Sequence, residues 1–389
     1  MTERISVGIE YLVAIGVGLS LVMFFLLENG RANAFATYLL AIAVLAAMFF
    51  PRLRAQLMAL PRDILLATVC LLEYLALSAF WSDTGGFQVM LQHQGYAALI
   101  LCFVLGLAMA CRRDAQFLPG LAYLVLLAAG VSAAYSIYLH VSLPDYQPLP
   151  EPRLYGLGRL SNPVISAASY GVAGVLGCWL LMRQRAGLIR LCLVLVLALL
   201  GLAILLSGTR TVWLALAVAV GAGFALGRQE RGLMWFAGVF GVMGLVGLLS
   251  IGWEDVVRRG LSFRPDIWSE FIGRSMAANP LLGVGSGTES YWETPVLTFQ
   301  HPHSVFVSAF FFGGFVGLGL LLLVLGTCAR HLRVAETSEV RTLAIMLLGF
   351  GVVFSVFDGD NILTKIDYLW WLIWLPIGVC LCLDGQRRS

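Results

Sequence analysis

The chain has 389 residues, of which 60% are hydrophobic and only 12% are charged, with a mean hydropathy of +0.88 and a net charge of +3. A water-soluble domain would carry roughly 25% charged residues. The composition therefore excludes a soluble globular protein and predicts a single integral membrane domain over residues 1–389. Nucleic-acid binding is not expected, because the arginines lie in short separate loops rather than in one basic patch.

Apolar runs long enough to cross a bilayer core of about 30 Å recur from one end of the chain to the other. The first run has no small-residue cleavage site after it, so we interpret it as a helix and not as a signal peptide. We predict an all-α polytopic membrane protein with about twelve spans. The predicted spans are 8–27, 34–50, 64–81, 94–111, 118–140, 163–182, 187–207, 211–226, 232–252, 303–327, 340–357 and 366–383.

The loops between these spans alternate in basic content. Most of the 25 Lys and Arg residues fall on the side that also carries both termini. The positive-inside rule then places both termini in the cytoplasm. The long segments 141–162 and 253–302 face outward, and the second is a large periplasmic loop between spans 9 and 10.

The outward loop 253–302 is not expected to be a flexible linker. Part of it places apolar residues such as Phe271 on one stripe of a short surface helix. Pro265 suits the first turn of this helix, and Asn279-Pro280 ends it. The glycines of the following "LLGVGSG" permit a tight turn whose exposed backbone N–H groups could bind an anion.

The next segment, "HPHSVFV", brings two histidines and a serine to the start of an apolar span. Pro302 suits a first helical residue with His301 near the N-cap, which would place His303 in the first turn. The positive end of the helix disfavours a protonated imidazole there, so His303 is a candidate general base. Two alternatives are open: an interfacial histidine that only hydrogen-bonds a loop, and a metal site formed with Asp358 and Asp360.

Arginine supplies nearly all the basic charge of the outward segments, and its planar fork is suited to phosphate. Arg210 stands in a predicted turn of three residues between two spans, where a charge is costly unless it has a function. We therefore expect several outward arginines to bind an anionic ligand.

The histidine segment also resembles a known motif. His303-Ser304, followed after nine residues by Gly314-Phe-Val-Gly317, resembles the H-[NSQ]-x9-G-x-x-G motif of O-antigen ligases.

Three further segments are similar to the wider O-antigen ligase and polymerase family. "GRLSNPVISAASY" (158–170) resembles its R-x-x-N-P segment ahead of a span. "LSGTRTVWLALAV" (206–218) resembles its S-x-[ST]-R-G-x-x-L-A-L turn, with Thr211 where glycine is usual. "RPDIWSEFIGRSMAANPLLGVGSG" (264–287) resembles its R-x-x-I-W … P-L-L-G-V-G segment, so the resemblance covers about 158–320 in order.

The resemblance implies a GT-C-type glycosyltransferase of lipopolysaccharide biosynthesis, acting at the periplasmic face of the bacterial inner membrane. It implies a glycan on undecaprenyl pyrophosphate as donor and a sugar hydroxyl of lipid A–core as acceptor, both held by their lipid tails in the membrane. The reaction would invert the anomeric centre, with no metal or other cofactor. Catalytic roles are expected for His303 and Arg210, and pyrophosphate binding for Arg159, Arg264 and Arg258.

Other functions are open at this stage. An O-antigen polymerase, or another surface-polymer ligase of the family, would use the same donor chemistry with a different acceptor. A polysaccharide transporter or flippase is expected to show paired broken spans and a site at mid-membrane. Here the polar groups gather on one face, which favours surface chemistry.

Overall fold

The computed structural model describes residues 2–28, 30–142, 153–184, 187–227, 241, 263–294 and 298–383. Within this part the chain is helical apart from one short hairpin, β1 (Trp292–Glu293) paired antiparallel with β2 (Thr298–Phe299). The predicted all-α polytopic class is confirmed.

The helices follow the apolar runs of the sequence. In chain order they are α1 (Thr2–Leu26), α2 (Gly30–Ala47), α3 (Pro51–Met58), α4 (Arg62–Ser78), η1 (Ala79–Trp81), α5 (Phe87–Arg113), α6 (Phe117–Ser142), α7 (Pro163–Arg183), α8 (Leu188–Leu206), α9 (Arg210–Gly227), α12 (Arg264–Ala278), α13 (Val305–Val334), α14 (Glu339–Phe357), η3 (Trp370–Trp374) and α15 (Leu375–Leu381).

Among the described helices, nine are long and apolar enough to cross a membrane, and two shorter apolar helices cover Arg210–Leu226 and Trp370–Leu381. These eleven correspond to eleven of the twelve predicted spans. The remaining prediction, 232–252, lies outside the described residues. The last span is shorter than the predicted 366–383, because the chain before Trp370 forms a loop of polar contacts.

The core is built around α7, which packs against α6, α8, α9 and α14. Small residues let these helices approach closely. At Gly171 of α7 a Cβ atom would lie 2.4 Å from the Phe350 ring of α14, so only glycine allows that ring to pack directly against the α7 backbone. Trp179 of α7 and the three tryptophans of η3 are fully buried.

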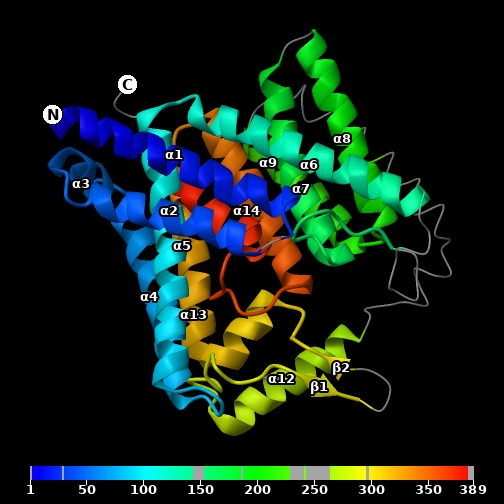
Figure 1. The fold of residues 1–389 in the computed structure, drawn as a ribbon. Helices are drawn as coiled ribbons and strands as arrows, with labels where there is room; N and C mark the ends of the chain where they lie inside the picture. Colours follow the sequence, from blue (N-terminus) through cyan, green and yellow to red (C-terminus); the bar gives the residue numbers. More distant parts are fainter. Residues whose placement is uncertain are drawn as a thin grey trace.

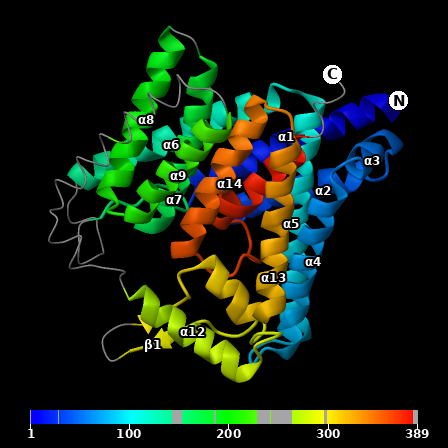
Figure 2. The ribbon, with the colours of Figure 1, turned by 180° about the vertical axis from the view of Figure 1, so that it is seen from behind.

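The start of the chain and α12 lie at opposite ends of the molecule. Figure 1 shows α12 and the two strands at the level of the lower ends of α4 and α5, with the start of α1 near the other end. From behind, α14 lies between α9 and α13 (Figure 2), and it packs against both.

Helix α13 is broken at Gly314, which has φ of 60° and ψ of −157°. A break leaves the last four carbonyl groups of the first half, those of residues 310–313, without helical partners. All four receive a donor from another segment. The donors in order are Ser275 Oγ (3.0 Å), Val284 N–H (2.9 Å), Gly285 N–H (2.9 Å) and Tyr74 Oη (2.8 Å).

The glycine-rich segment after α12 is therefore not an anion site, and that prediction is wrong. Its N–H groups are used internally, since Gly283 donates to Asn279 O at 2.7 Å while the next two residues donate to α13. A Cβ atom at Gly283 would lie 2.5 Å from the Gly314 nitrogen, so glycine permits the loop to contact the break directly. The helix before it does contain Pro265 in its first turn and ends at Asn279, as predicted.

Candidate active site

His303 precedes α13 instead of lying in its first turn, so that prediction is wrong. The helix begins at Val305, and Ser304 rather than His301 is the N-cap, with Ser304 Oγ accepting from Val307 N–H at 3.4 Å. His303 adopts the left-handed φ of 51°, which is uncommon for a residue with a side chain. Its environment is therefore set by the neighbouring loops and not by the helix end.

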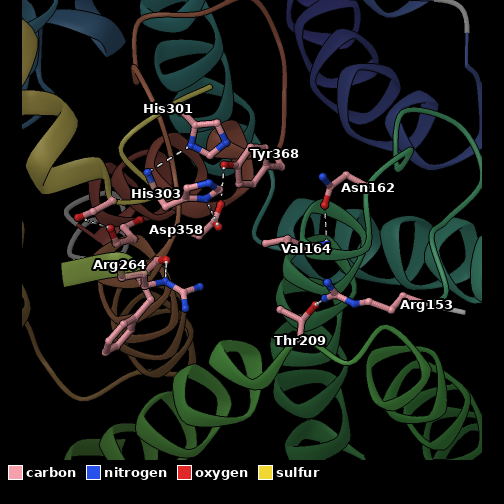
Figure 3. A network of polar contacts seen from close by, with 12 residues as sticks. Arg153, Asn162, Val164, Thr209, Arg264, His301, His303, Asp358 and Tyr368 are labelled. Carbon is pink, nitrogen blue, oxygen red and sulfur yellow. Dashed lines mark hydrogen bonds and ion pairs between the residues drawn. The ribbon is translucent and has the colours of Figure 1, made fainter. Parts of the chain in front are cut away.

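The main partner of His303 is Asp358, which directly follows α14. His303 Nδ1 lies 3.3 Å from Asp358 Oδ2, and Tyr368 Oη donates to Asp358 Oδ1 at 3.1 Å (Figure 3). Asp358 is only 4% exposed. Burial opposes its ionisation, but His303, His301 and Arg264 outweigh burial, so the pKa of Asp358 lies below its usual value.

An ionised Asp358 determines which nitrogen of His303 carries the proton. The carboxylate accepts from Nδ1–H, which leaves Nε2 as the acceptor for a proton from a substrate. The orientation of this imidazole therefore follows from Asp358 and not from the helix end.

His301 supports the backbone of His303. The His303 N–H donates to His301 Nδ1 at 3.3 Å, and the two ring centroids are 3.9 Å apart. Burial lowers the pKa of His301, and the neighbouring His303 lowers it further, although Asp360 and Asp358 act in the opposite direction. A neutral His301 can accept the backbone hydrogen bond and hold His303 in its left-handed conformation.

The metal alternative gains no support from the part of the chain that the structure describes. Asp360 does lie near both histidines, and burial raises its pKa. No group of three or more His, Cys, Asp or Glu side chains among the described residues could hold a metal ion.

Arg264 approaches the same carboxylate from the start of α12. Its Nε donates to Phe357 O at 2.7 Å, one residue before Asp358. Burial lowers the pKa of Arg264, the charge of Asp358 raises it, and the charge of Arg210 lowers it. Arg210 is therefore close enough to Arg264 for the two charges to interact. Among the described residues Arg264 has no carboxylate at ion-pair distance, which leaves its charge available to an anion.

Arg210 is the first residue of α9 and is half-buried, while the turn before it is made by residues 207–209. Arg153 holds this turn: its Nε donates to Ser207 O at 2.7 Å and its Nη2 to Thr209 Oγ1 at 3.3 Å. Gly208 provides the left-handed φ of 65°. Sequence reasoning missed the role of Arg153, because no local pattern links residues that are more than fifty positions apart.

Arg159 lies beside Phe24 and Asp367. Its guanidinium carbon is 5.9 Å from the centre of the Phe24 ring, and its charge acts on Asp367. Burial raises the pKa of Asp367 to about 6, although hydrogen bonds from Thr364 and from Leu369 N–H and the charge of Arg159 favour ionisation. The assignment of Arg159 to a pyrophosphate site stays a prediction.

The motif that carries Arg159 has a structural explanation as well. Asn162 Oδ1 accepts from Val164 N–H at 2.7 Å and caps α7 (Figure 3), while Pro163 is the first helical residue. Gly158, with φ of 74°, lies against the end of α1, and a Cβ atom there would be 2.8 Å from Phe24 O.

The structure brings His303, Arg210 and Arg264 together, and Arg258 lies outside the described residues. Two further residues belong to the site. Asp358 could be suspected from "FDGDN" after an apolar run, whereas Tyr368 looks like any aromatic residue near the start of a span.

Two comparisons with known proteins show what the chain is similar to. A family model described as O-antigen ligase matches residues 195–322. Over 369 residues the chain is 29% identical to an O-antigen ligase of Pseudomonas aeruginosa, covering 91% of this chain and 85% of the relative. The chain is similar to the O-antigen ligases along most of its length.

The family match confirms the resemblance seen in the sequence motifs. The segment of this chain that matches the family model contains Arg210, Arg264 and His303, while Asp358 and Tyr368 follow it. The candidate site thus combines residues from inside and outside the matched segment.

Proposed function

We infer that this protein is an O-antigen ligase of lipopolysaccharide assembly. It transfers a glycan from undecaprenyl pyrophosphate to a sugar hydroxyl of lipid A–core, with inversion and as a GT-C-type enzyme. The observation that carries this inference is the position of the His303–Asp358 pair beside two arginines from different helices, Arg264 and Arg210.

His303 is the proposed general base. Its Nε2 takes the proton of the acceptor hydroxyl as the oxygen forms a bond to the anomeric carbon of the donor. Asp358 keeps the opposite nitrogen protonated and stabilises the imidazolium that forms. Tyr368 donates to the other oxygen of Asp358 and so fixes the orientation of the carboxylate.

Arg264 and Arg210 are the proposed partners of the leaving group. The bond between the anomeric carbon and the phosphate oxygen breaks, and its electron pair passes to the lipid pyrophosphate. Arginines already in place stabilise this growing negative charge without a metal. Both stand at the first residue of a helix, where unpaired backbone N–H groups also favour an anion.

The proposed face of the membrane follows from the charge pattern. The positive-inside rule puts both termini in the cytoplasm and the His303 end of the bundle in the periplasm. Both substrates carry lipid tails, so a site at the ends of α9, α13 and α14 lets the tails stay in the bilayer while the sugars react outside it.

The decisive experiment is transfer by purified protein in liposomes with undecaprenyl-pyrophosphate glycan, lipid A–core and EDTA. Wild type is expected to modify lipid A–core at a rate that EDTA leaves unchanged. His303→Ala is expected to lose at least about 10²-fold in rate. The control is His331→Ala, which removes an imidazole at the far end of the same helix and is expected to keep the wild-type rate.

The outcomes separate the alternatives. Lengthening of the lipid-linked glycan with unmodified lipid A–core would show a polymerase. Equal rates for wild type and His303→Ala would remove the proposed base.

A further inference from the structure

We propose that a cavity beside the His303–Asp358 pair binds a sugar unit of the acceptor glycan. This assignment rests on the proposed function and names the part of the site that selects the acceptor. The cavity has a volume of about 450 Å³ and lies among the ends of α1 and α6, the segment 154–161, and Asp367-Tyr368. A pocket that holds a small ligand typically measures about 300–1,000 Å³.

The chemistry of the lining suits a sugar. Glu28, Ser161 and Asp367 offer oxygen atoms to hydroxyl groups, and Arg159 adds a donor. Leu139, Leu157 and Ile165 add apolar surface to the same space, against which the C–H groups of a pyranose can pack. A ligand that carries both hydroxyl groups and C–H faces fits such a mixed lining better than a purely apolar lipid tail does.

Tyr368 connects the cavity to the proposed base. The residue lines the cavity, and its hydroxyl donates to Asp358 Oδ1 at 3.1 Å. The other carboxylate oxygen faces His303 Nδ1 at 3.3 Å. A sugar in the cavity therefore lies one side chain away from the His303–Asp358 pair.

The direction of approach assigns the sugar to the acceptor. In an inverting displacement the attacking oxygen and the leaving oxygen lie on opposite sides of the anomeric carbon. Arg264, proposed to bind the leaving group, comes from α12, whereas the cavity is bounded by α1 and α6. Figure 3 shows Arg264 and Tyr368 on different sides of Asp358. The cavity thus lies on the side from which the acceptor hydroxyl must arrive.

Ser161→Trp tests the assignment, because Ser161 is exposed, lines the cavity and has no role in the proposed chemistry. Its matched control is Ser269→Trp, at an exposed position of α12 outside the cavity. Glu28→Gln, which keeps the side-chain shape, serves as a second cavity variant if the tryptophan lowers the yield of folded protein.

Binding is measured by saturation-transfer NMR on the purified full chain with two lipid-free probes, the core oligosaccharide and the O-antigen repeat. We expect the core oligosaccharide to bind wild type and Ser269→Trp equally and Ser161→Trp at least about ten-fold more weakly. In transfer assays the KM for lipid A–core should rise by a similar factor, with kcat and the donor KM unchanged. Glu28→Gln should raise the acceptor KM in the same direction.

Equal binding of the core oligosaccharide to all variants, or no binding to wild type, would overturn the proposal. Selective loss of O-antigen repeat binding in Ser161→Trp would also overturn it, by assigning the cavity to the donor. If no protein transfers glycan to lipid A–core but core binding still depends on Ser161, the proposed function fails and the cavity assignment stands.

Discussion

Helix α13 has a histidine–aspartate pair near each end, and the two pairs have different surroundings. At one end His303 Nδ1 lies 3.3 Å from Asp358, and at the other His331 Nε2 lies 2.9 Å from Asp63. Asp63 also pairs with Arg330. The side chain of Asp63 is 31% exposed, whereas that of Asp358 is 6% exposed.

The arginines near the Asp63 end have mixed partners. Arg113 and Arg183 contact the carboxylates of Glu10 (3.3 Å) and Glu339, while Arg341 donates to the backbone carbonyls of Leu332 and Leu226. At the Asp358 end Arg264 donates to a backbone carbonyl and has no carboxylate partner among the described residues. A histidine–aspartate contact alone therefore does not make an active site. A buried carboxylate, its contact with Tyr368 and an adjoining cavity distinguish the His303 end.

The sharpest test of this comparison replaces each aspartate by asparagine. Asp358→Asn is expected to lower kcat about 10- to 100-fold, because the amide no longer selects the productive tautomer or stabilises the imidazolium. The KM values for donor and acceptor should change little, since neither substrate contacts Asp358. Steady-state transfer kinetics at saturating donor measure both quantities.

Asp63→Asn is the matched control for that experiment, and its kcat should stay within about two-fold of wild type. A comparable loss in both variants would mean that the two pairs share a structural role.

A second test replaces arginine by lysine at each end. Arg264→Lys keeps the charge but loses the planar fork, so we expect transfer to fall by about ten-fold, mainly through kcat. Arg330→Lys should leave the rate unchanged, because an exposed pair with Asp63 contributes about 0–1 kcal/mol. The measurement is the transfer rate at saturating concentrations of both substrates. Full activity of Arg264→Lys would indicate that only the charge of Arg264, or only its hydrogen bond to Phe357 O, is needed.

The smallest expected effect concerns the break that separates the two halves of α13. Gly314→Ala places a Cβ atom 2.3 Å from Leu281 O at a φ of 60°, so it should lower the apparent Tm by about 5 °C. Gly319→Ala is the control, because a Cβ atom there meets nothing within 4 Å. Thermal unfolding followed by intrinsic fluorescence compares the two, and equal Tm values would show that the break tolerates a side chain.

Much of the fold could be predicted because bilayer crossing depends on local sequence. Eleven predicted spans correspond to described helices, and Pro265 and Asn279 bound α12 as expected. Charge distribution and motif order also selected His303, Arg210 and Arg264 before any contact was known. Hydropathy, charge and short motifs each depend on neighbouring residues, so they can be read from a short stretch of the sequence.

The site itself depended on contacts between distant segments. Asp358 meets His303 across 55 positions, and Arg153 secures the turn before Arg210 from a separate loop. The glycines of 283–285 were assigned to an anion, but the Gly283 N–H donates to Asn279 O and the Gly285 N–H to Phe312 O at the break in α13.

The sequence by itself thus determined a polytopic helical protein and its similarity to the O-antigen ligases. Only the tertiary structure decided which nitrogen of His303 faces Asp358 and where the cavity lies. The reason is physical. Hydropathy and helix ends act over a few residues, whereas a proton position depends on a buried charge that the fold brings from elsewhere in the chain.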